Sequence, residues 1–110
     1  MRDKIRNQLR AFRLPGRCAF NKVPEHLHDG IVAYLVDGIT PGGFFTAVIC
    51  NDLRGAFERG DTLSLNHMRA IMAYMYSCPP SVCWGSVERM VAWQRVRECT
   101  PLTEADWTIL

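Results

Sequence analysis

Asn51 and Asp52 form a polar pair inside an otherwise apolar segment, residues 40–59, around which the chain is organised. Asp52 follows Phe45 by seven positions and Val48 by four. That spacing places Asp52 on the helix stripe that should face the core. A buried carboxylate is costly unless it is paired or hydrogen-bonded, so the sequence predicts a specific partner for Asp52.

Asp52 has a functional and a structural interpretation. It can hold a ligand or a cation of a partner, or it can cap a neighbouring helix or pair with an arginine such as Arg69 or Arg89. We favour the structural role, because buried polar groups usually belong to internal networks. Asn51 lies towards the edge of the stripe, where its amide can read the base edge of a ligand or bond the backbone of a loop.

Gly42 and Gly43 fall in the first turn of the same predicted helix. Free backbone N–H groups and the helix dipole favour an anion there, and glycine allows a phosphate to approach closely. The segment matches neither the P-loop nor the dinucleotide-binding pattern, and no strand precedes it. Tight packing in a helix–helix corner is therefore the favoured interpretation.

Trp84 lies in a short loop, residues 81–85, that follows Pro79 and Pro80. Its ring can stack on a base or nucleotide ring, as can the ring of Tyr76. Aromatic side chains in a loop of this size equally often cover the core. Four methionines suit an adaptable binding groove, but their helical spacing favours a place in the core: Met68, Met72, Met75 and Met90.

Histidine and cysteine side chains give little sign of a metal site or a catalytic centre. His26 and His28 lie on different helix faces, and Cys78 and Cys83 flank two prolines, so neither pair has the spacing of a structural zinc site. No thiol has an adjacent base, and no nucleophile, acid–base pair or metal-ligand set is clustered. We therefore predict no metal, no cofactor and no enzymatic activity.

Helical periodicity recurs along the chain, whereas sustained alternation of polar and apolar residues does not occur. Pro24, Thr40 and Ser86 mark helix starts, Thr62 or Ser64 can cap another helix, and Gly38 marks a helix end. The pattern predicts an all-α fold, a compact bundle of four to five short helices joined by tight turns. The expected helices cover residues 2–12, 24–37, 40–59, 64–77 and 86–98, followed by a last turn from residue 103.

The N-terminus differs from the rest of the chain in charge. Residues 1–22 hold seven basic residues and one acidic residue, a net charge of +6, whereas the remaining 88 residues carry −4. We accordingly divide the chain into a basic arm with a short helix, residues 1–22, and one helical domain, residues 23–110. Such an arm is solvated or meets nucleic acid or an acidic partner. Its cations include Arg2, Lys4, Arg6, Arg10, Arg13 and Arg17.

Length and hydropathy place the chain among globular proteins of one domain. It has 110 residues, of which 48% are hydrophobic and 22% charged. No run approaches the roughly 20 apolar residues that span a bilayer, and the first residues contain no apolar signal segment. We therefore expect a cytoplasmic protein that does not contact a membrane.

A set of short motifs is spread over the segment 23–93. It comprises Pro24-Glu25-His26, Tyr34, Gly38, Pro41-Gly42-Gly43-Phe44, Asn51-Asp52-Leu53, Ala56, Gly60-Asp61, Cys83-Trp84-Gly85-Ser86 and Trp93. In these residues the segment resembles a family of small proteins encoded by phages and prophages. The resemblance implies a viral setting, the cytosol of a host cell and a single-domain protein without established enzymology, and it supplies no catalytic residue.

We therefore expect a small non-enzymatic accessory protein that acts as a binding module. The leading hypothesis is counter-defence, in which the protein sequesters a nucleotide-derived signal or occludes a host protein through Gly42, Gly43, Asn51, Asp52 and Trp84. A homo-oligomer is expected, because a small helical bundle offers few deep pockets except between subunits. The alternative is a nucleic-acid-binding protein that lays its basic arm against phosphates.

Overall fold

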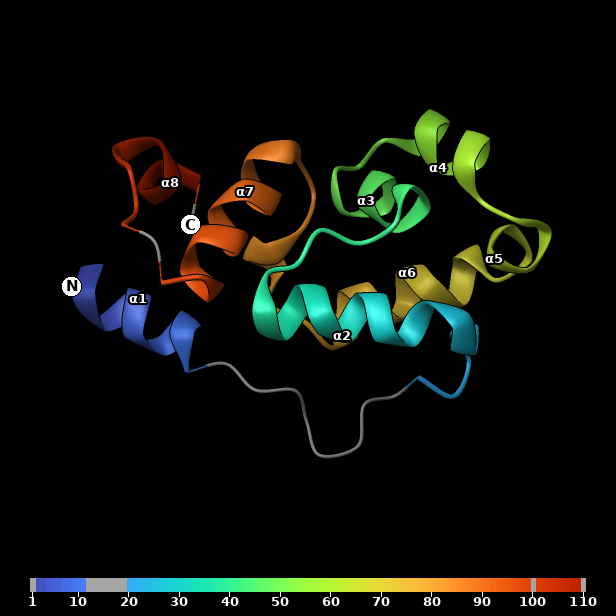
Figure 1. The fold of residues 1–110 in the computed structure, drawn as a ribbon, viewed down its shortest axis with the longest axis horizontal. Helices are drawn as coiled ribbons and strands as arrows, with labels where there is room; N and C mark the ends of the chain where they lie inside the picture. Colours follow the sequence, from blue (N-terminus) through green and yellow to red (C-terminus); the bar gives the residue numbers. More distant parts are fainter. Residues whose placement is uncertain (1, 12–19, 100, 110) are drawn as a thin grey trace.

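The computed structural model describes residues 2–11, 20–99 and 101–109, and within these ranges all regular structure is helical. This confirms the predicted all-α fold. The helices are more numerous and shorter than predicted, because two of the expected helices are each divided in two. The elements (Figure 1) are α1 Arg2–Arg10, the 3-10 helix η1 Glu25–Leu27, α2 His28–Asp37, α3 Gly43–Ile49, α4 Leu53–Arg59, α5 Thr62–Asn66, α6 Met68–Ser77, the 3-10 helix η2 Ser81–Cys83, α7 Val87–Arg97 and α8 Glu104–Ile109.

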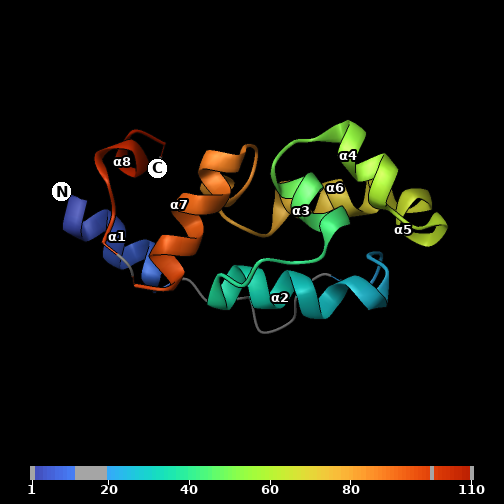
Figure 2. The same cartoon turned by 45° about the horizontal axis from the view of Figure 1, so that its top comes forward.

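Helices α2, α3, α6 and α7 supply the centre of the molecule, and burial of their apolar side chains is the main source of stability. The apolar stripe predicted for residues 40–59 is confirmed within α3, where Phe45, Val48 and Ile49 are buried. Helices α1 and α8 lie beside α7 at one end of the molecule, and α4 and α5 lie at the other end (Figures 1 and 2). Fully buried side chains of the four central helices include Ile31, Tyr34, Leu35, Ile49, Ile71, Met75, Trp93 and Val96.

The predicted helix over residues 40–59 is broken in its middle, which corrects that prediction. Asn51 adopts the left-handed conformation, with φ 60°. The backbone N–H of Asn51 donates to the carbonyl of Val48 (3.1 Å), and the backbone N–H of Asp52 donates to the carbonyl of Ala47 (2.8 Å). These two bonds make the Schellman turn that ends many helices, and asparagine tolerates its left-handed position better than most residues.

Two helix starts lie elsewhere than predicted. The N-cap of α3 is Gly42 rather than Thr40. The N-cap of α5 is Asp61 rather than Thr62 or Ser64, and its carboxylate accepts a hydrogen bond from the amide of Ser64 (2.7 Å). An aspartate at the N-cap accepts hydrogen bonds from the free backbone N–H groups of the first turn, and its negative charge interacts favourably with the positive end of the helix dipole. It therefore caps a helix at least as well as serine or threonine does.

Two other predicted boundaries are confirmed. Gly38 ends α2 in the left-handed conformation, with φ 72°, as expected of a glycine at this position. Ser86 caps α7, where its hydroxyl accepts a hydrogen bond from the amide of Arg89 (3.1 Å).

Helix α7 holds both ends of the described chain. The guanidinium of Arg97 donates from Nη1 to the carbonyls of Leu9 and Arg10, each at 3.0 Å, and from Nε to the carbonyl of Val36 at 2.8 Å. One arginine thereby satisfies carbonyls near the C-terminal ends of both α1 and α2, which a helix leaves free. Two residues earlier in α7, Arg95 forms an ion pair with Asp106 of α8 at 2.7 Å.

Candidate ligand groove

A groove of 390 Å³ opens where α6 ends, where α7 begins and where α3 turns into α4. It brings together two of the predicted site residues, Asn51 and Trp84, which lie 33 positions apart in the sequence. Tyr76, Ser81 and Arg89 contribute further polar or aromatic groups to its wall. The volume lies in the range of small-molecule sites, and a few convergent polar groups beside aromatic rings are typical of them.

Trp84 and Tyr76 form the aromatic wall of the groove. Their ring centroids are 5.1 Å apart and the planes are inclined by 83°, an edge-to-face arrangement. Trp84 is partly buried, whereas Tyr76 is 79% exposed. Because the edge contact leaves most of the Tyr76 ring in solvent, that ring is free to stack on a flat ligand.

The turn that carries Trp84 is fixed to the core from two sides. The phenol of Tyr34, in α2, donates a 2.6 Å hydrogen bond to the carbonyl of Cys83. The amide of Gly85 donates a 2.7 Å bond to the carbonyl of Ile49, at the end of α3. The position of Trp84 relative to Asn51 is therefore set by hydrogen bonds to the backbone on both sides of Trp84, which makes the groove largely preformed.

Arg89 supplies the positive charge of the groove. Its Nη1 donates to the carbonyls of Trp84 (3.2 Å) and Ser81 (3.4 Å). Among the residues that the structure describes, Nε and Nη2 of Arg89 have no hydrogen-bond partner, and no carboxylate lines the groove. Guanidinium groups bind carboxylates and phosphates through such paired N–H groups, so the groove favours an anionic ligand.

The contribution of Arg89 is one that the sequence interpretation missed, since it considered Arg89 as a partner for Asp52. A usable signal was present in the sequence. Ser86 at the N-cap makes Arg89 the third residue of α7, so its side chain points back over the preceding turn, which contains Trp84.

Asp52 does not face the core, which corrects the prediction of a buried carboxylate. Its side chain is 52% exposed and accepts a 2.9 Å hydrogen bond from the amide of Gly55, as the N-cap of α4. Its nearest cation is Arg59, with 3.9 Å between Oδ2 and Nη1, and neither predicted arginine pairs with it. The capping role was one of the structural alternatives, and it is the one observed.

Replacing Asp52 with alanine is expected to lower the free energy of unfolding by about 1 kcal/mol, because the amide of Gly55 loses its acceptor. Asp52→Asn keeps an acceptor and should cost less than half as much. Urea denaturation followed by circular dichroism measures both. Equal losses for the two variants would show that the carboxylate charge matters, through Arg59, rather than the cap.

Gly42 and Gly43 lie apart from the Trp84 groove, beside a second hollow of 310 Å³. A Cβ atom on Gly43 would come within 2.9 Å of Cδ of Arg59, so this glycine makes room for the arginine side chain. Arg59 and Asp61 both line this hollow, so its lining has no excess of positive charge from these two residues that would favour an anion. Close packing, the favoured interpretation of the two glycines, therefore accounts for Gly43 without a ligand.

His26, Ser64 and Asp61 gather at this hollow, but not as a catalytic relay. Nε2 of His26 lies 3.0 Å from Oγ of Ser64 and 3.2 Å from Oδ2 of Asp61. In a serine hydrolase the two contacts use different ring nitrogens, so that one accepts the serine proton while the other is held by the carboxylate. A single nitrogen cannot serve both, and the cluster ties η1 to α5.

Two of the described thiols, those of Cys50 and Cys83, are poor nucleophiles. Burial raises the pKa of the Cys83 thiol to about 12, and it also raises the pKa of Cys50. Both thiols are protonated at neutral pH, whereas nucleophilic attack needs the thiolate. Within the described ranges, no group of three or more histidine, cysteine, aspartate or glutamate side chains is placed to hold a metal ion.

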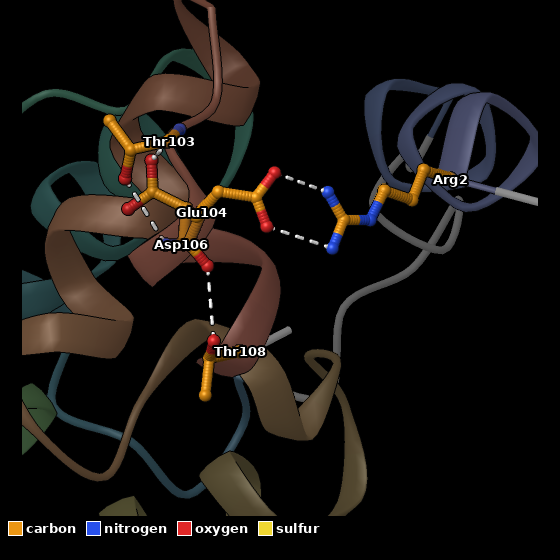
Figure 3. A network of polar contacts seen from close by, with 5 residues as sticks. All are labelled: Arg2, Thr103, Glu104, Asp106 and Thr108. Atoms are coloured by element: carbon orange, nitrogen blue, oxygen red, sulfur yellow. Dashed lines mark hydrogen bonds and ion pairs between the residues drawn. The ribbon is translucent and has the colours of Figure 1, made fainter.

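The basic arm is represented by α1, whose cations are partly engaged. Arg2 makes a two-pronged ion pair with Glu104 of α8, at 2.7 and 3.0 Å (Figure 3), and Arg6 pairs with Asp3 at 2.7 Å. Lys4 is exposed. Exposed ion pairs contribute little and exchange readily, so nucleic-acid binding by the arm stays a prediction. Arg10 is partly buried, and its backbone carbonyl accepts a hydrogen bond from Arg97. Arg13 and Arg17 lie outside the described residues.

Comparison of the chain with protein-family models, with curated proteins and with solved structures found no match. Across the described residues, none of the helices has the length and apolar character that a bilayer crossing requires.

Proposed function

We propose that the protein is a small non-enzymatic binding module whose groove takes a nucleotide-like ligand, a planar ring that carries an anionic group. The observation that carries this proposal is the convergence of Tyr76, Trp84, Asn51 and Arg89 on one 390 Å³ groove. Tyr76 and Trp84 offer ring faces and edges, Asn51 offers a side-chain amide, and Arg89 offers a guanidinium. These groups match the ring, the hydrogen-bonding edge and the phosphate of a nucleotide.

The setting that we propose is that of a phage-encoded counter-defence protein in the cytosol of a host cell. The support is the resemblance of residues 23–93 to small phage and prophage proteins. In that setting, a protein without catalytic groups acts by sequestration, and a nucleotide-derived signal is the ligand that suits the groove. Occlusion of a host protein by the same surface is the second form of the hypothesis.

A panel of ligands tests the proposal by thermal shift and calorimetry. Cyclic nucleotides, nucleoside monophosphates and ADP-ribose derivatives are compared with the matching uncharged nucleosides. We expect at least one anionic member to stabilise the protein and its nucleoside to bind more weakly, because Arg89 has nothing to contact. If no member of the panel binds, the small-molecule form of the proposal is wrong.

Tyr76→Ala is expected to weaken binding of the active ligand by roughly tenfold to a hundredfold, the usual loss when a stacking ring is removed. Tyr76 is largely exposed, so the fold should keep its stability. Ile39→Ala is the matched control, since Ile39 is 56% exposed and lies outside the groove. Calorimetry on both variants separates the two results, and unchanged affinity in Tyr76→Ala would place the ligand elsewhere.

A further inference from the structure

Helix α4 carries an apolar ridge on the outside of the molecule. Leu53 is 66% exposed and Phe57 is 53% exposed. The two residues are four positions apart, so they lie one turn apart on the same face of the helix. Large apolar side chains that are exposed side by side often mark a protein interface.

A shallow apolar hollow lies directly beside this ridge. It has a volume of 60 Å³ and is lined by Leu53 and Ala56 of α4 and by Met68 and Met72 of α6, among others. Leu53 thus belongs to both the ridge and the hollow. Methionine side chains adapt their shape to a partner, so the hollow can accommodate an inserted apolar group.

The charges along the ridge have a definite order. Arg54 follows Leu53, and Glu58 follows Phe57, so one flank of the ridge is basic at its first turn and acidic at its second. The two side chains form an exposed ion pair, with 3.0 Å between Nε and Oε1. If two such helices lie antiparallel about a two-fold axis, each basic position faces an acidic position of the other copy.

We propose that the protein forms a symmetric dimer through antiparallel contact of α4 with α4 of a second copy. In this arrangement Leu53 of one copy contacts Phe57 of the other copy. The apolar ridge of each copy packs into the hollow of the other. Arg54 faces Glu58 of the second copy, and the same pair recurs across the axis. A surface that is complementary to itself in shape and charge is what a two-fold interface requires.

The size of the patch determines how tight this dimer is. Helix α4 has seven residues, so the contact falls at or below the lower end of the area that specific stable interfaces bury. The dimer is therefore reversible and concentration-dependent. The inference does not rest on the proposed ligand, because the ridge residues do not line the groove.

Sedimentation velocity of the full chain, from about 10 μM to about 1 mM, tests the proposal in a range that suits a weak complex. We expect a monomer–dimer equilibrium that Leu53→Asp and Phe57→Asp abolish, while thermal melts show that both variants stay folded. Ile39→Asp, at an equally exposed apolar position outside the patch, should leave the equilibrium unchanged. A wild-type protein that stays monomeric throughout overturns the proposal.

Charge exchange tests the antiparallel geometry. R54E and E58R should each weaken dimerisation by about tenfold, because each places like charges opposite one another. An equimolar mixture of the two variants, or the double variant R54E/E58R, should recover the wild-type affinity. Association that survives Leu53→Asp, or that charge exchange fails to rescue, would show that another surface is responsible.

Discussion

Asp106→Ala is expected to lower the free energy of unfolding by about 2–3 kcal/mol, the largest loss that we predict for a polar side chain. Asp106 is 3% exposed and accepts two hydrogen bonds from Nη1 of Arg95, at 2.7 and 2.8 Å. It also closes a reciprocal cap with Thr103 (Figure 3), accepting from that amide at 2.9 Å while its own amide donates to the threonine hydroxyl. Alanine removes both functions, so α8 loses its anchor on α7. Urea denaturation measures the change, and a loss below about 0.5 kcal/mol, typical of a surface pair, would contradict it.

The pH dependence of this effect has a definite sign. Burial by itself raises the pKa of Asp106, but hydrogen bonds from Arg95 and Thr103 outweigh it and hold the pKa below its ordinary value. The stabilisation is therefore present above the unfolded pKa, about 3.9, and is lost as the pH falls through the lower folded value. Asp106→Asn is the matched control, because it keeps the shape of the side chain without the charge. The difference in unfolding free energy between wild type and this variant should shrink below about pH 4.

Gly38→Ala is expected to cost about 2–3 kcal/mol, because the position combines a left-handed backbone with a close approach to α7. Gly38 has φ 72°, and a Cβ atom there would lie 3.1 Å from Cβ of Arg97 and 3.2 Å from the carbonyl oxygen of Gln94. The side-chain amide of Gln94 also donates to the carbonyl of Gly38 at 3.0 Å. Any adjustment that relieves the contact therefore disturbs the packing of α2 on α7.

Gly30 is the internal control for this prediction, since it lies in the same helix. A Cβ atom on Gly30 would meet only Pro41, at an ordinary distance of 3.8 Å. Gly30→Ala should therefore raise the stability by about 0.5–1 kcal/mol, through the lower backbone entropy of the unfolded chain. Thermal unfolding of the two variants should move in opposite directions, and a loss in both would mean that the cost at Gly38 is not specific to its conformation.

The fold class followed from periodicity and from breaks that have a local cause. Gly38 and Ser86 end and start helices through interactions within a few residues, and sequence inspection is suited to such interactions. The prediction of an unbroken helix through Asn51 and Asp52 is wrong, because the apolar stripe continues in register from Phe45 to Phe57 and conceals the break. Periodicity alone predicts one continuous helix over this segment. It does not register that Asn51 can end a helix in a left-handed turn and that Asp52 can cap the start of the next one.

The groove could be predicted only in part. Asn51 and Trp84 were recognised as residues able to contact a ligand, but their meeting depends on the bond between Gly85 and Ile49, which joins distant segments. The sequence around Gly43 suits an anion site, whereas the contact that explains this glycine is with Arg59, sixteen positions further on. Side-chain type indicates which chemistry a residue can perform, and long-range packing decides which residues perform it together.

Helix α1 is attached in a way that allows it to detach while the rest of the molecule stays folded. None of its nine residues, all of which the structure describes, is buried. Its contacts with the rest of the molecule include the hydrogen bonds from Arg97 to its last carbonyls, the exposed ion pair between Arg2 and Glu104, and packing of the partly buried Leu9 against the core. Release of α1 therefore exposes little apolar surface, and the free energy of that opening lies well below the free energy of global unfolding. The cations of α1 become available through a local equilibrium, which salt can shift while the core remains intact.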